Sequence, residues 1–423
     1  MIQQKGNFKD VIVFGFALFA MFFGAGNLIF PPYLGIITGP EWLTAFGGFT
    51  FADAGLALLA VMATAKYDGD VIALFRRAGG KLAIVLGCAD ILCIGPFLAI
   101  PRTGATTYEM GIMPLLGDAI PIAVFAAIFF ILTYILTIKP SKVVDIVGQF
   151  LTPALLIALA ILIVKGVITP LGEIRPDTLV PSVFAEGVNQ GYQTMDTLAA
   201  TVFSTIVIVS IMEKGYDDEK LMVKATIGAG AIAVIGMGLV YGGLCYVGAT
   251  VSTQYGIDVE QTALIVAITE ALLGQTGKIL LAIIVALACL TTSIGLTSAA
   301  GRYFSGLTNG KLKYEHIVVG VCVFSAVISN FGVSTIIKFS APILSIVYPA
   351  TITLIILSLF GHKIKNDNVF KCATYMALLI SVLTIAGVEF IVTLPGYQFG
   401  FNWILPVAAA AIIGNFIPSK KAA

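Results

Sequence analysis

The run Gly24-Ala25-Gly26-Asn27 interrupts the first long apolar segment of the chain, roughly in the middle of that segment. In hydrocarbon an unpaired backbone N–H or C=O group is costly, so irregular backbone at this depth survives only where it lines a cavity or binds a ligand. A helix that restarts near Asn27 would direct its free N–H groups and its positive dipole end at the gap, which suits a carboxylate. Carbonyl groups freed before the gap, near Ala20 and Phe23, suit a small hard cation.

Simpler interpretations of this run exist. The Asn27 amide oxygen could bind the cation, or it could satisfy a freed backbone group. Two glycines alone are typical of a kinked packing helix. A dinucleotide-binding loop is a poor fit, because the third glycine and the preceding strand are missing. The interpretation as a binding site therefore depends on a matching feature elsewhere in the chain.

A second interrupted segment lies between Gly187 and Leu198, ahead of the uninterrupted apolar run 199–211. It contains the polar stretch Gln193-Thr194-Met195-Asp196. An ionisable residue inside a membrane-spanning segment indicates a functional site by default, so Asp196 is a candidate functional residue. The alternative is a carboxylate that pairs with a nearby hydroxyl and only holds the helix bundle together.

Consecutive hydroxyl groups form a third feature, in the run Ala288-Cys289-Leu290-Thr291-Thr292-Ser293 of a later apolar segment. They offer oxygen ligands without charge. Serine and threonine often donate to carbonyl groups of their own helix, so the run alone is a weak signal. Next to a broken first helix it becomes a candidate sodium site.

Composition indicates the kind of protein that must position these groups. Of the 423 residues 58% are apolar and only 11% are charged, and the mean hydropathy is +1.01. Soluble domains carry about 25% charged residues, so the chain is expected to be an integral membrane protein. The net charge of +1 gives no indication of nucleic-acid binding. The cysteines lie in or beside apolar runs and the two histidines in charged connections, which disfavours a disulfide framework or a metal site.

Other classes of membrane protein fit poorly. An enzyme should show converging nucleophile, base and metal residues, but the sequence has no HExxH motif, GxSxG motif or histidine cluster. A channel would need rings or repeats of one filter motif. We therefore expect no catalytic residues and no covalently bound cofactor.

Twelve apolar segments approach the length of about 20 residues that a membrane span requires. They run approximately over 10–37, 41–65, 81–104, 118–138, 143–165, 190–212, 223–250, 277–301, 316–330, 335–360, 371–394 and 402–417. A short amphipathic piece at 259–274 is expected to be interfacial or re-entrant.

The two broken segments are the first and the sixth, which occupy the same place in successive groups of five. Because five is odd, the groups have opposite orientations, as in the inverted repeats of secondary transporters. We therefore expect an all-α integral membrane protein with about 12 transmembrane helices. Its parts would be a first repeat over 1–168, an inverted repeat over 187–360 and two extra helices over 371–417.

The distribution of positive charge predicts the orientation. Cytoplasmic loops of membrane proteins carry an excess of lysine and arginine. If the segments alternate from a cytoplasmic N-terminus, all but five of the 24 lysines and arginines fall in the cytoplasm. Both termini are therefore expected there. The five on the outer side would be Arg102, Lys165, Arg175, Lys278 and Lys338.

Three motifs carry a resemblance to a known family. The stretches MFFGAGNLIFPPYLG (21–35), GYQTMDTLAA (191–200) and CLTTSIGLTS (289–298) resemble the bacterial branched-chain amino acid:cation symporters, the "system II carrier" family of the APC superfamily. The likeness covers the whole chain in length and span count. It implies the LeuT-type fold in a bacterial cytoplasmic membrane. It also implies uptake of leucine, isoleucine and valine driven by sodium or, in some members, by protons.

The resemblance also implies roles for individual residues. The N–H groups of Ala25 and Gly26 would hold the substrate carboxylate, and the stretch from Gln193 to Asp196 would receive the ammonium group. Asn27 matches a side chain that serves a second sodium ion in some relatives. The third helix has Gly95–Pro101 where some relatives use a tyrosine. The implied ligands of the common sodium site are the carbonyls of Ala20, Phe23 and Ala288 and the hydroxyls of Thr291 and Thr292.

The coupling ion is expected to be sodium. Proton-coupled relatives often carry a lysine inside the fifth helix, and residues 143–164 contain none. Asp196 keeps a proton as the alternative, and another neutral amino acid is the alternative substrate. For three further acids that the sequence places in apolar segments, Asp53, Asp90 and Glu389, we expect structural or gating hydrogen bonds. Transport would proceed by alternating access.

Overall fold

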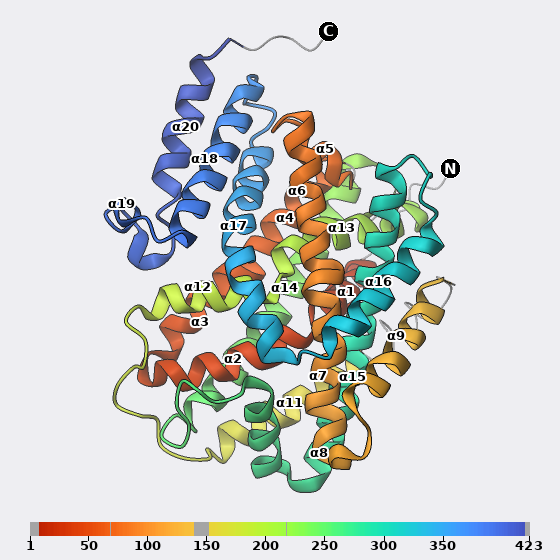
Figure 1. Cartoon of the computed structure of the whole chain (residues 1–423), viewed down its shortest axis with the longest axis vertical. Coiled ribbons are helices and arrows are strands. Elements are labelled where there is room, and N and C mark those ends of the chain that lie inside the picture. The colour runs from red at the N-terminus through yellow and green to blue at the C-terminus, as the bar shows by residue number, and fades with distance from the viewer. Residues whose placement is uncertain (1–7, 68, 139–151, 217, 419–423) are drawn as a thin grey trace.

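A computed structural model describes residues 8–67, 69–138, 152–216 and 218–418, and in this part of the chain every regular element is helical (Figure 1). The helices that cover the first five expected segments are α1 (Phe8–Phe22), α2 (Ala25–Thr38), α3 (Trp42–Thr50), α4 (Leu56–Ala65), α5 (Val71–Arg76), α6 (Gly80–Leu92), α7 (Ala99–Thr107), α8 (Met113–Leu116), α9 (Ile122–Ile138) and α11 (Thr152–Ile168). Short 3-10 or π-helical pieces join some of them: η1 (Gly39–Glu41), η2 (Phe51–Gly55), η3 (Cys93–Phe97), η4 (Tyr108–Ile112) and η5 (Gly117–Ala119).

The second part of the chain has the same character. Its helices are α12 (Val183–Thr194), α13 (Asp196–Glu213), α14 (Glu219–Ala249), α15 (Gln261–Leu307), α16 (Tyr314–Ser329), α17 (Val333–Leu359), α18 (Asp367–Ile385), α19 (Glu389–Val392) and α20 (Ile404–Phe416), with η7 (Tyr397–Phe399) before α20. Seven helices or helix runs are long and apolar enough to cross a membrane, and four shorter apolar helices accompany them among the described residues. The expected all-α membrane fold is confirmed. The boundaries of the two repeats stay a prediction.

The outer surface is apolar, as a lipid-facing surface must be. In α9 the side chains of Val124, Ile128, Ile131 and Ile135 are exposed at helical spacing, whereas Phe129 on the opposite face is buried. In a soluble protein such a stripe would be covered by another element. Here it gives the helix one face for lipid and one for the bundle.

Glycines let the helices of the interior approach closely. A Cβ placed on Gly35 of α2 would lie 1.9 Å from the carbonyl oxygen of Cys245, and one placed on Gly248 of α14 would lie 2.0 Å from the carbonyl oxygen of Pro32. A Cβ on Gly187 of α12 would meet the Ala45 carbonyl oxygen of α3 at 2.2 Å. Small residues at such crossings replace the hydrophobic driving force that lipid does not supply.

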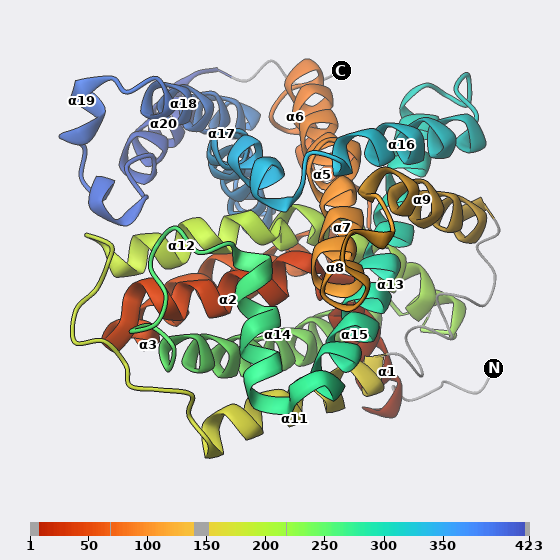
Figure 2. The same ribbon diagram turned by 60° about the horizontal axis from the view of Figure 1, so that its bottom comes forward.

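The two expected breaks are present. The first segment divides at Phe23 and Gly24 between α1 and α2. The sixth divides at Met195, whose left-handed backbone (φ 69°) separates α12 from α13. Helices α2 and α12 run side by side in the interior, as Figure 2 shows. The fold therefore brings two interrupted helices, far apart in the sequence, into contact.

Other expected boundaries need correction. The third segment does not end at 104, because its helical course continues through α7 and η4 to Leu116. Arg102, expected outside the membrane, is therefore in mid-segment and only 3% exposed. The piece at 259–274 is present as the first part of α15; this part ends at the non-helical backbone of Gly274 (φ 62°, ψ −153°), where two helices meet across a kink. Its interfacial or re-entrant position stays a prediction. Part of the fifth segment, 143–151, lies outside the described residues.

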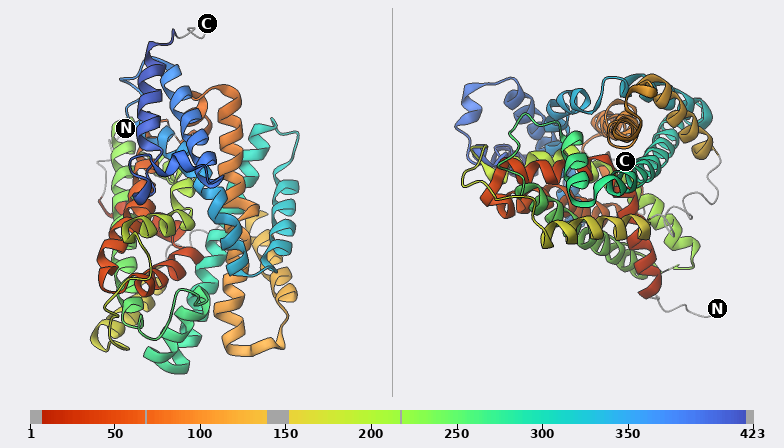
Figure 3. Two further views of the ribbon diagram at one scale, coloured as in Figure 1. Left: turned by 60° about the vertical axis from the view of Figure 1, so that its left-hand side comes forward. Right: turned by 90° about the horizontal axis from the view of Figure 1, so that it is seen from below.

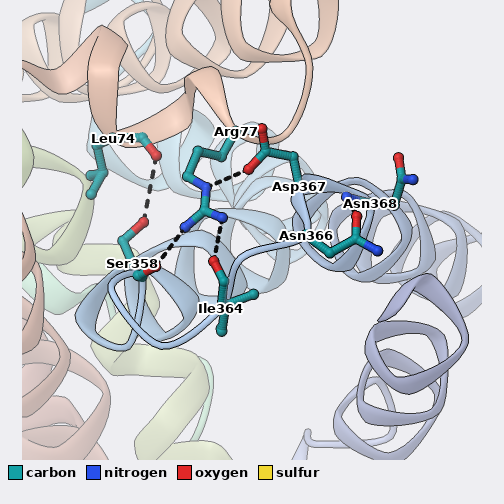
Figure 4. Close-up of polar contacts among 8 residues, drawn as sticks. Leu74, Arg77, Ser358, Ile364, Asn366, Asp367 and Asn368 are labelled. Atoms are coloured by element: carbon teal, nitrogen blue, oxygen red, sulfur yellow. Dashed lines mark hydrogen bonds and ion pairs between the residues drawn. The ribbon is translucent and has the colours of Figure 1, made fainter. Parts of the chain in front are cut away.

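The last two long helices, α18 and α20, lie side by side at one edge of the molecule (Figure 3). Figure 4 shows the contacts by which Arg77, just after α5, stabilises the connection that leads into α18. Its Nε donates to Asp367 at 2.6 Å, and its two terminal nitrogens donate to the carbonyl oxygens of Gly361 at 2.9 Å and Ile364 at 2.5 Å. The arginine thus satisfies free carbonyls in the connection between α17 and α18.

Candidate substrate and ion site

The first break leaves backbone groups with new partners. In a continuous helix the Gly24 amide would donate to the Ala20 carbonyl. It donates instead to the Asn27 side-chain oxygen at 2.9 Å, which frees the Ala20 carbonyl from that bond. Asn27 therefore satisfies a freed backbone group, one of the two roles considered for it. Helix α2 begins at Ala25, so the N–H groups of its first turn point toward the gap.

Asn27 also joins the first break to the second. Its side-chain nitrogen donates to the Asp196 carboxylate at 2.7 Å and to the Tyr241 hydroxyl of α14. Asn27 is 1% exposed and Asp196 is 4% exposed. The partner of Asp196 is thus an amide rather than the hydroxyl considered from the sequence. A buried polar network of this kind stabilises one arrangement of the helices when its members are satisfied.

Asp53 extends the network to the second segment. It lies in η2, a π-helical piece in mid-segment, and is fully buried. Thr194 donates from its hydroxyl to Asp53 Oδ1 at 2.7 Å. The Asp53 and Asp196 carboxyl groups neighbour each other. The expected structural hydrogen bond of Asp53 is present, and it lies next to the candidate site residues.

Arg102 is a member of the site that the sequence prediction missed. From α7 its Nη1 donates to the Gln193 carbonyl at 2.6 Å and its Nη2 to the Thr194 carbonyl at 3.3 Å. These are carbonyls that the resemblance assigns to the substrate ammonium group. The default interpretation of a buried charge inside a span as functional would have identified Arg102.

A narrow cavity lies between the two breaks, and residues of both breaks are in its lining. Its polar wall is formed by Gly24, Ala25, Gly26, Asn27, Arg102, Thr103, Thr194, Asp196 and Thr292. Its apolar wall is formed by Met21, Phe22, Ile94, Ala99, Met195, Ala199, Phe203 and Leu296. The lining therefore combines charged groups of both signs with hydrocarbon side chains. Gln193 lies outside this lining, and its side chain accepts from Ser340 at 2.8 Å.

The hydroxyl run in α15 divides into two kinds of threonine. Thr291 donates to the Ala288 carbonyl of its own helix at 2.8 Å, which is the ordinary use of such a residue. The Thr292 hydroxyl is buried and has no hydrogen-bond partner among the described residues. It lies 3.1 Å from the position that a Cβ on Gly24 would take. Thr292 therefore presents an unused oxygen ligand to the first break, beside Gly24.

The two remaining acids lie elsewhere. Thr351 donates to both carboxylate oxygens of buried Asp90, at 3.0 and 3.2 Å, which is the structural bond expected for this acid. Glu389, expected in an apolar segment, is exposed in the short helix α19. The eleventh expected segment, 371–394, includes this residue, but α18 already ends at Ile385.

Comparison with known proteins gives whole-chain matches. Residues 7–421 match the sequence profile of a family described as "Branched-chain amino acid transport protein". The chain is 39% identical over 435 residues to the branched-chain amino acid permease BraB of Bacillus subtilis, covering 98% of this chain and 97% of the relative. It is 35% identical to the branched-chain amino acid transport system 2 carrier protein of Pseudomonas aeruginosa, with 98% and 96% covered. The permease BrnQ of Escherichia coli is 33% identical, with 96% and 94% covered.

Two solved structures are similar in fold. One is Mhp1, a nucleobase-cation-symport-1 family transporter, in a closed conformation with bromovinylhydantoin bound; it has a TM-score of 0.62 at 15% identity and covers 96% of this chain and 91% of its own. The other is MhsT in complex with L-phenylalanine, with a TM-score of 0.59 at 16% identity and 95% and 97% covered. These similarities confirm the LeuT-type architecture.

Proposed function

Because this chain belongs to the family of branched-chain amino acid transport proteins, we propose that it carries leucine, isoleucine and valine into the cell together with sodium. The observation that carries the proposal is the cavity between the two broken helices. It combines charged groups of both signs with an apolar wall, which is the chemistry of a zwitterion with a hydrocarbon side chain. A relative at 39% identity over nearly the whole chain is named as a branched-chain amino acid permease, which supports the same substrate class.

The substrate would lie with its carboxylate at the first turn of α2, where the amides of Ala25 and Gly26 have no acceptor within their own helix. A helix N-terminus favours an anion through its N–H groups and its dipole. The ammonium group would face Asp196 and the carbonyl groups at the end of α12. The side chain would lie against Ile94, Phe203 and Leu296 of the apolar wall. Burial of its methyl groups there would supply affinity.

Sodium would bind beside the first break. The supporting observation is the buried Thr292 hydroxyl without a partner, next to Gly24. Hard cations take oxygen ligands, and threonine hydroxyls and free carbonyls supply them without extra charge. The carbonyls of Ala20, Phe23 and Ala288 and the hydroxyl of Thr291 would complete the site, and Thr291 would turn from its bond to Ala288.

A proton is the alternative coupling ion. Asp53 and Asp196 neighbour each other in a buried region that contains one arginine, Arg102. Two carboxylates and one guanidinium leave one negative charge, which either a sodium ion or a proton would neutralise. Two neighbouring like charges in a low dielectric are costly, and a proton shared by the pair would remove that cost.

Alternating access would move one group of helices against the others. Asn27, Asp53, Asp196 and Tyr241 come from four different expected spans, the first, second, sixth and seventh, and are linked by the buried network. A network of this kind would let the four spans move as one body. Ligands that bind one conformation better would shift the equilibrium between inward-open and outward-open states. The protein would lie in the bacterial cytoplasmic membrane with both termini in the cytoplasm.

The test is uptake of radiolabelled leucine into proteoliposomes under an imposed sodium gradient. We expect uptake to require the gradient and to be inhibited by isoleucine and valine but weakly by alanine. Uptake driven by a pH gradient and indifferent to sodium would refute the sodium assignment. Inhibition by alanine equal to that by isoleucine would refute the assignment of branched-chain substrates.

A substitution of Thr292 tests where the sodium ion would bind. Thr292→Ala should raise the sodium concentration for half-maximal uptake by about 10-fold or more, since one ligand of a hard cation is worth at least one charge-assisted contact. The preference among leucine, isoleucine and valine should not change. Thr374→Ala is the matched control, because Thr374 is also buried but donates to Phe370 of its own helix α18. An unchanged sodium response in Thr292→Ala would remove this residue from the site.

A further inference from the structure

Arg102 carries a buried positive charge whose hydrogen-bonding capacity is only partly used. A guanidinium group has five N–H donors. Two bonds, to the Gln193 and Thr194 carbonyls, are present, and Nε is buried without a partner among the described residues. Placing an arginine inside a membrane bundle is costly and is tolerated where the charge has a function. Two neutral carbonyls do not compensate a full charge.

The position of the Arg102 guanidinium indicates which kind of group its unused donors would bind. A Cβ on Gly26 would lie 2.9 Å from Arg102 Nη2, so the guanidinium lies against the first turn of α2. Two positive features, the guanidinium and the N-terminal end of the α2 dipole, thus face the same part of the cavity. Asp196 attracts Arg102, but no ion pair between them is present in the described chain, and Asp196 Oδ2 accepts from Asn27. Among the described residues no carboxylate forms a hydrogen bond or an ion pair with the Arg102 guanidinium.

We propose that Arg102 binds the carboxylate of the transported amino acid, together with the amide groups of Ala25 and Gly26. This inference rests on the proposed function, because it assigns a residue to the same site. The planar guanidinium suits a carboxylate, which it can bind with two parallel hydrogen bonds. The unpartnered Nε and an Nη group form the required pair of donors. The ammonium group then lies toward Asp196, so each charge of the zwitterion has a partner of opposite sign.

Binding of the carboxylate by Arg102 would also connect helices that move relative to one another during transport. Arg102 belongs to the third expected span, whereas the Ala25 and Gly26 amides belong to the first, within the group of spans that the buried network joins. A carboxylate held by both connects that group to its surroundings. The guanidinium bonds to the Gln193 and Thr194 carbonyls connect the same two parts without substrate. The guanidinium has further donors for the carboxylate beside these two bonds, so substrate binding would add to this connection.

The experiment compares leucine with leucinol, which has the same side chain and ammonium group but a hydroxymethyl group in place of the carboxylate. Binding of both to the purified full-length protein is measured by competition with radiolabelled leucine. The wild type should prefer leucine by about 10- to 100-fold, the value of hydrogen bonds to a charged group. In Arg102→Gln this ratio should fall by about 10-fold, because only the Ala25 and Gly26 amides then remain to hold the carboxylate. Loss of leucine affinity should account for the fall, because leucinol affinity would change little.

The ratio of leucine affinity to leucinol affinity distinguishes substrate binding by Arg102 from a structural role of this residue. If Arg102 only stabilised the end of α12, Arg102→Gln would weaken both ligands equally and the ratio would stay at its wild-type value, which would overturn the proposal. Arg77→Gln is the matched control, since Arg77 also donates to backbone carbonyls but lies outside the cavity. Its ratio should equal that of the wild type.

A second variant covers the case in which Arg102→Gln does not fold. Arg102→Lys keeps the charge but loses the planar pair of donors, so the ratio should fall by at least about 5-fold. A wild-type ratio in Arg102→Lys would overturn the assignment. Failure of the proposed function is distinguishable, because the wild type would then not bind leucine at all.

Discussion

Replacement of Asn27 by alanine is the perturbation that the buried network makes most informative. This side chain accepts from the Gly24 amide at 2.9 Å and donates to Asp196 at 2.7 Å and to the Tyr241 hydroxyl. Alanine removes all three contacts in a place that water scarcely reaches, because Asn27 is 1% exposed. The first break then loses its link to the second.

The expected loss in the free energy of unfolding follows from the polar groups that lose Asn27 as their hydrogen-bond partner. A buried polar group without a partner costs about 1–3 kcal/mol in a soluble protein. In membrane bundles single hydrogen bonds average about 0.6 kcal/mol, because the unfolded chain in the membrane also finds partners. Three contacts, one of them to a carboxylate, then give a loss of about 2–4 kcal/mol in the free energy of unfolding.

The assay is denaturant unfolding of the purified protein in mixed micelles, followed by circular dichroism. Asn330→Ala is the control, since exposed Asn330 donates only to carbonyls of its own helix, Ala326 and Val327. It should cost less than about 0.5 kcal/mol, as surface substitutions usually do. A loss in Asn27→Ala no larger than that of the control would refute the view that Asn27 joins the two breaks.

Two further predictions concern packing and a second buried acid. Gly35→Ala should destabilise the protein by at least about 2 kcal/mol, because its Cβ would lie 1.9 Å from the Cys245 carbonyl oxygen. Gly47→Ala is the control and should be neutral or stabilising, because a Cβ there meets nothing within 4 Å. Equal unfolding midpoints of the two variants would contradict this prediction. Thr351→Val should cost about 2 kcal/mol of stability, because it leaves the buried Asp90 carboxylate unpaired. Asp90→Asn should cost less than about 1 kcal/mol, because the amide oxygen still accepts from the Thr351 hydroxyl. The reverse order in denaturant unfolding would contradict this prediction.

The broken helices could be predicted because their signal is local. Glycines and polar residues inside an apolar segment oppose a continuous span wherever they occur, so the interruption at Gly24 and the one beside Asp196 were both visible in the sequence. The pairing of Asn27 with Asp196 was not, because the two residues are 169 positions apart and depend on how the helices pack. Patterns along the chain locate the interruptions but not the side chains that meet across them.

Arg102 shows where hydropathy fails. An arginine among threonines lowers the mean hydropathy of the third segment, so the sequence predicts an end near 104 and places the charge outside. In the structure the residues around Arg102 face a polar cavity rather than lipid, and the helical course continues to Leu116. Glu389 is the opposite case: apolar neighbours suggested a buried acid, but a turn brings it to the surface. Hydropathy reports the average environment of a segment and does not distinguish lipid from an internal cavity.

The central claim is that substrate and sodium bind together between the two broken helices. The most direct test is the dissociation constant of leucine, measured by calorimetry on the purified protein over a series of sodium concentrations with potassium holding the ionic strength constant. Two ligands that stabilise the same conformation must each raise the affinity of the other. The leucine dissociation constant should therefore fall as sodium rises until the sodium site is saturated. A dissociation constant that is independent of sodium but changes with pH would contradict the account.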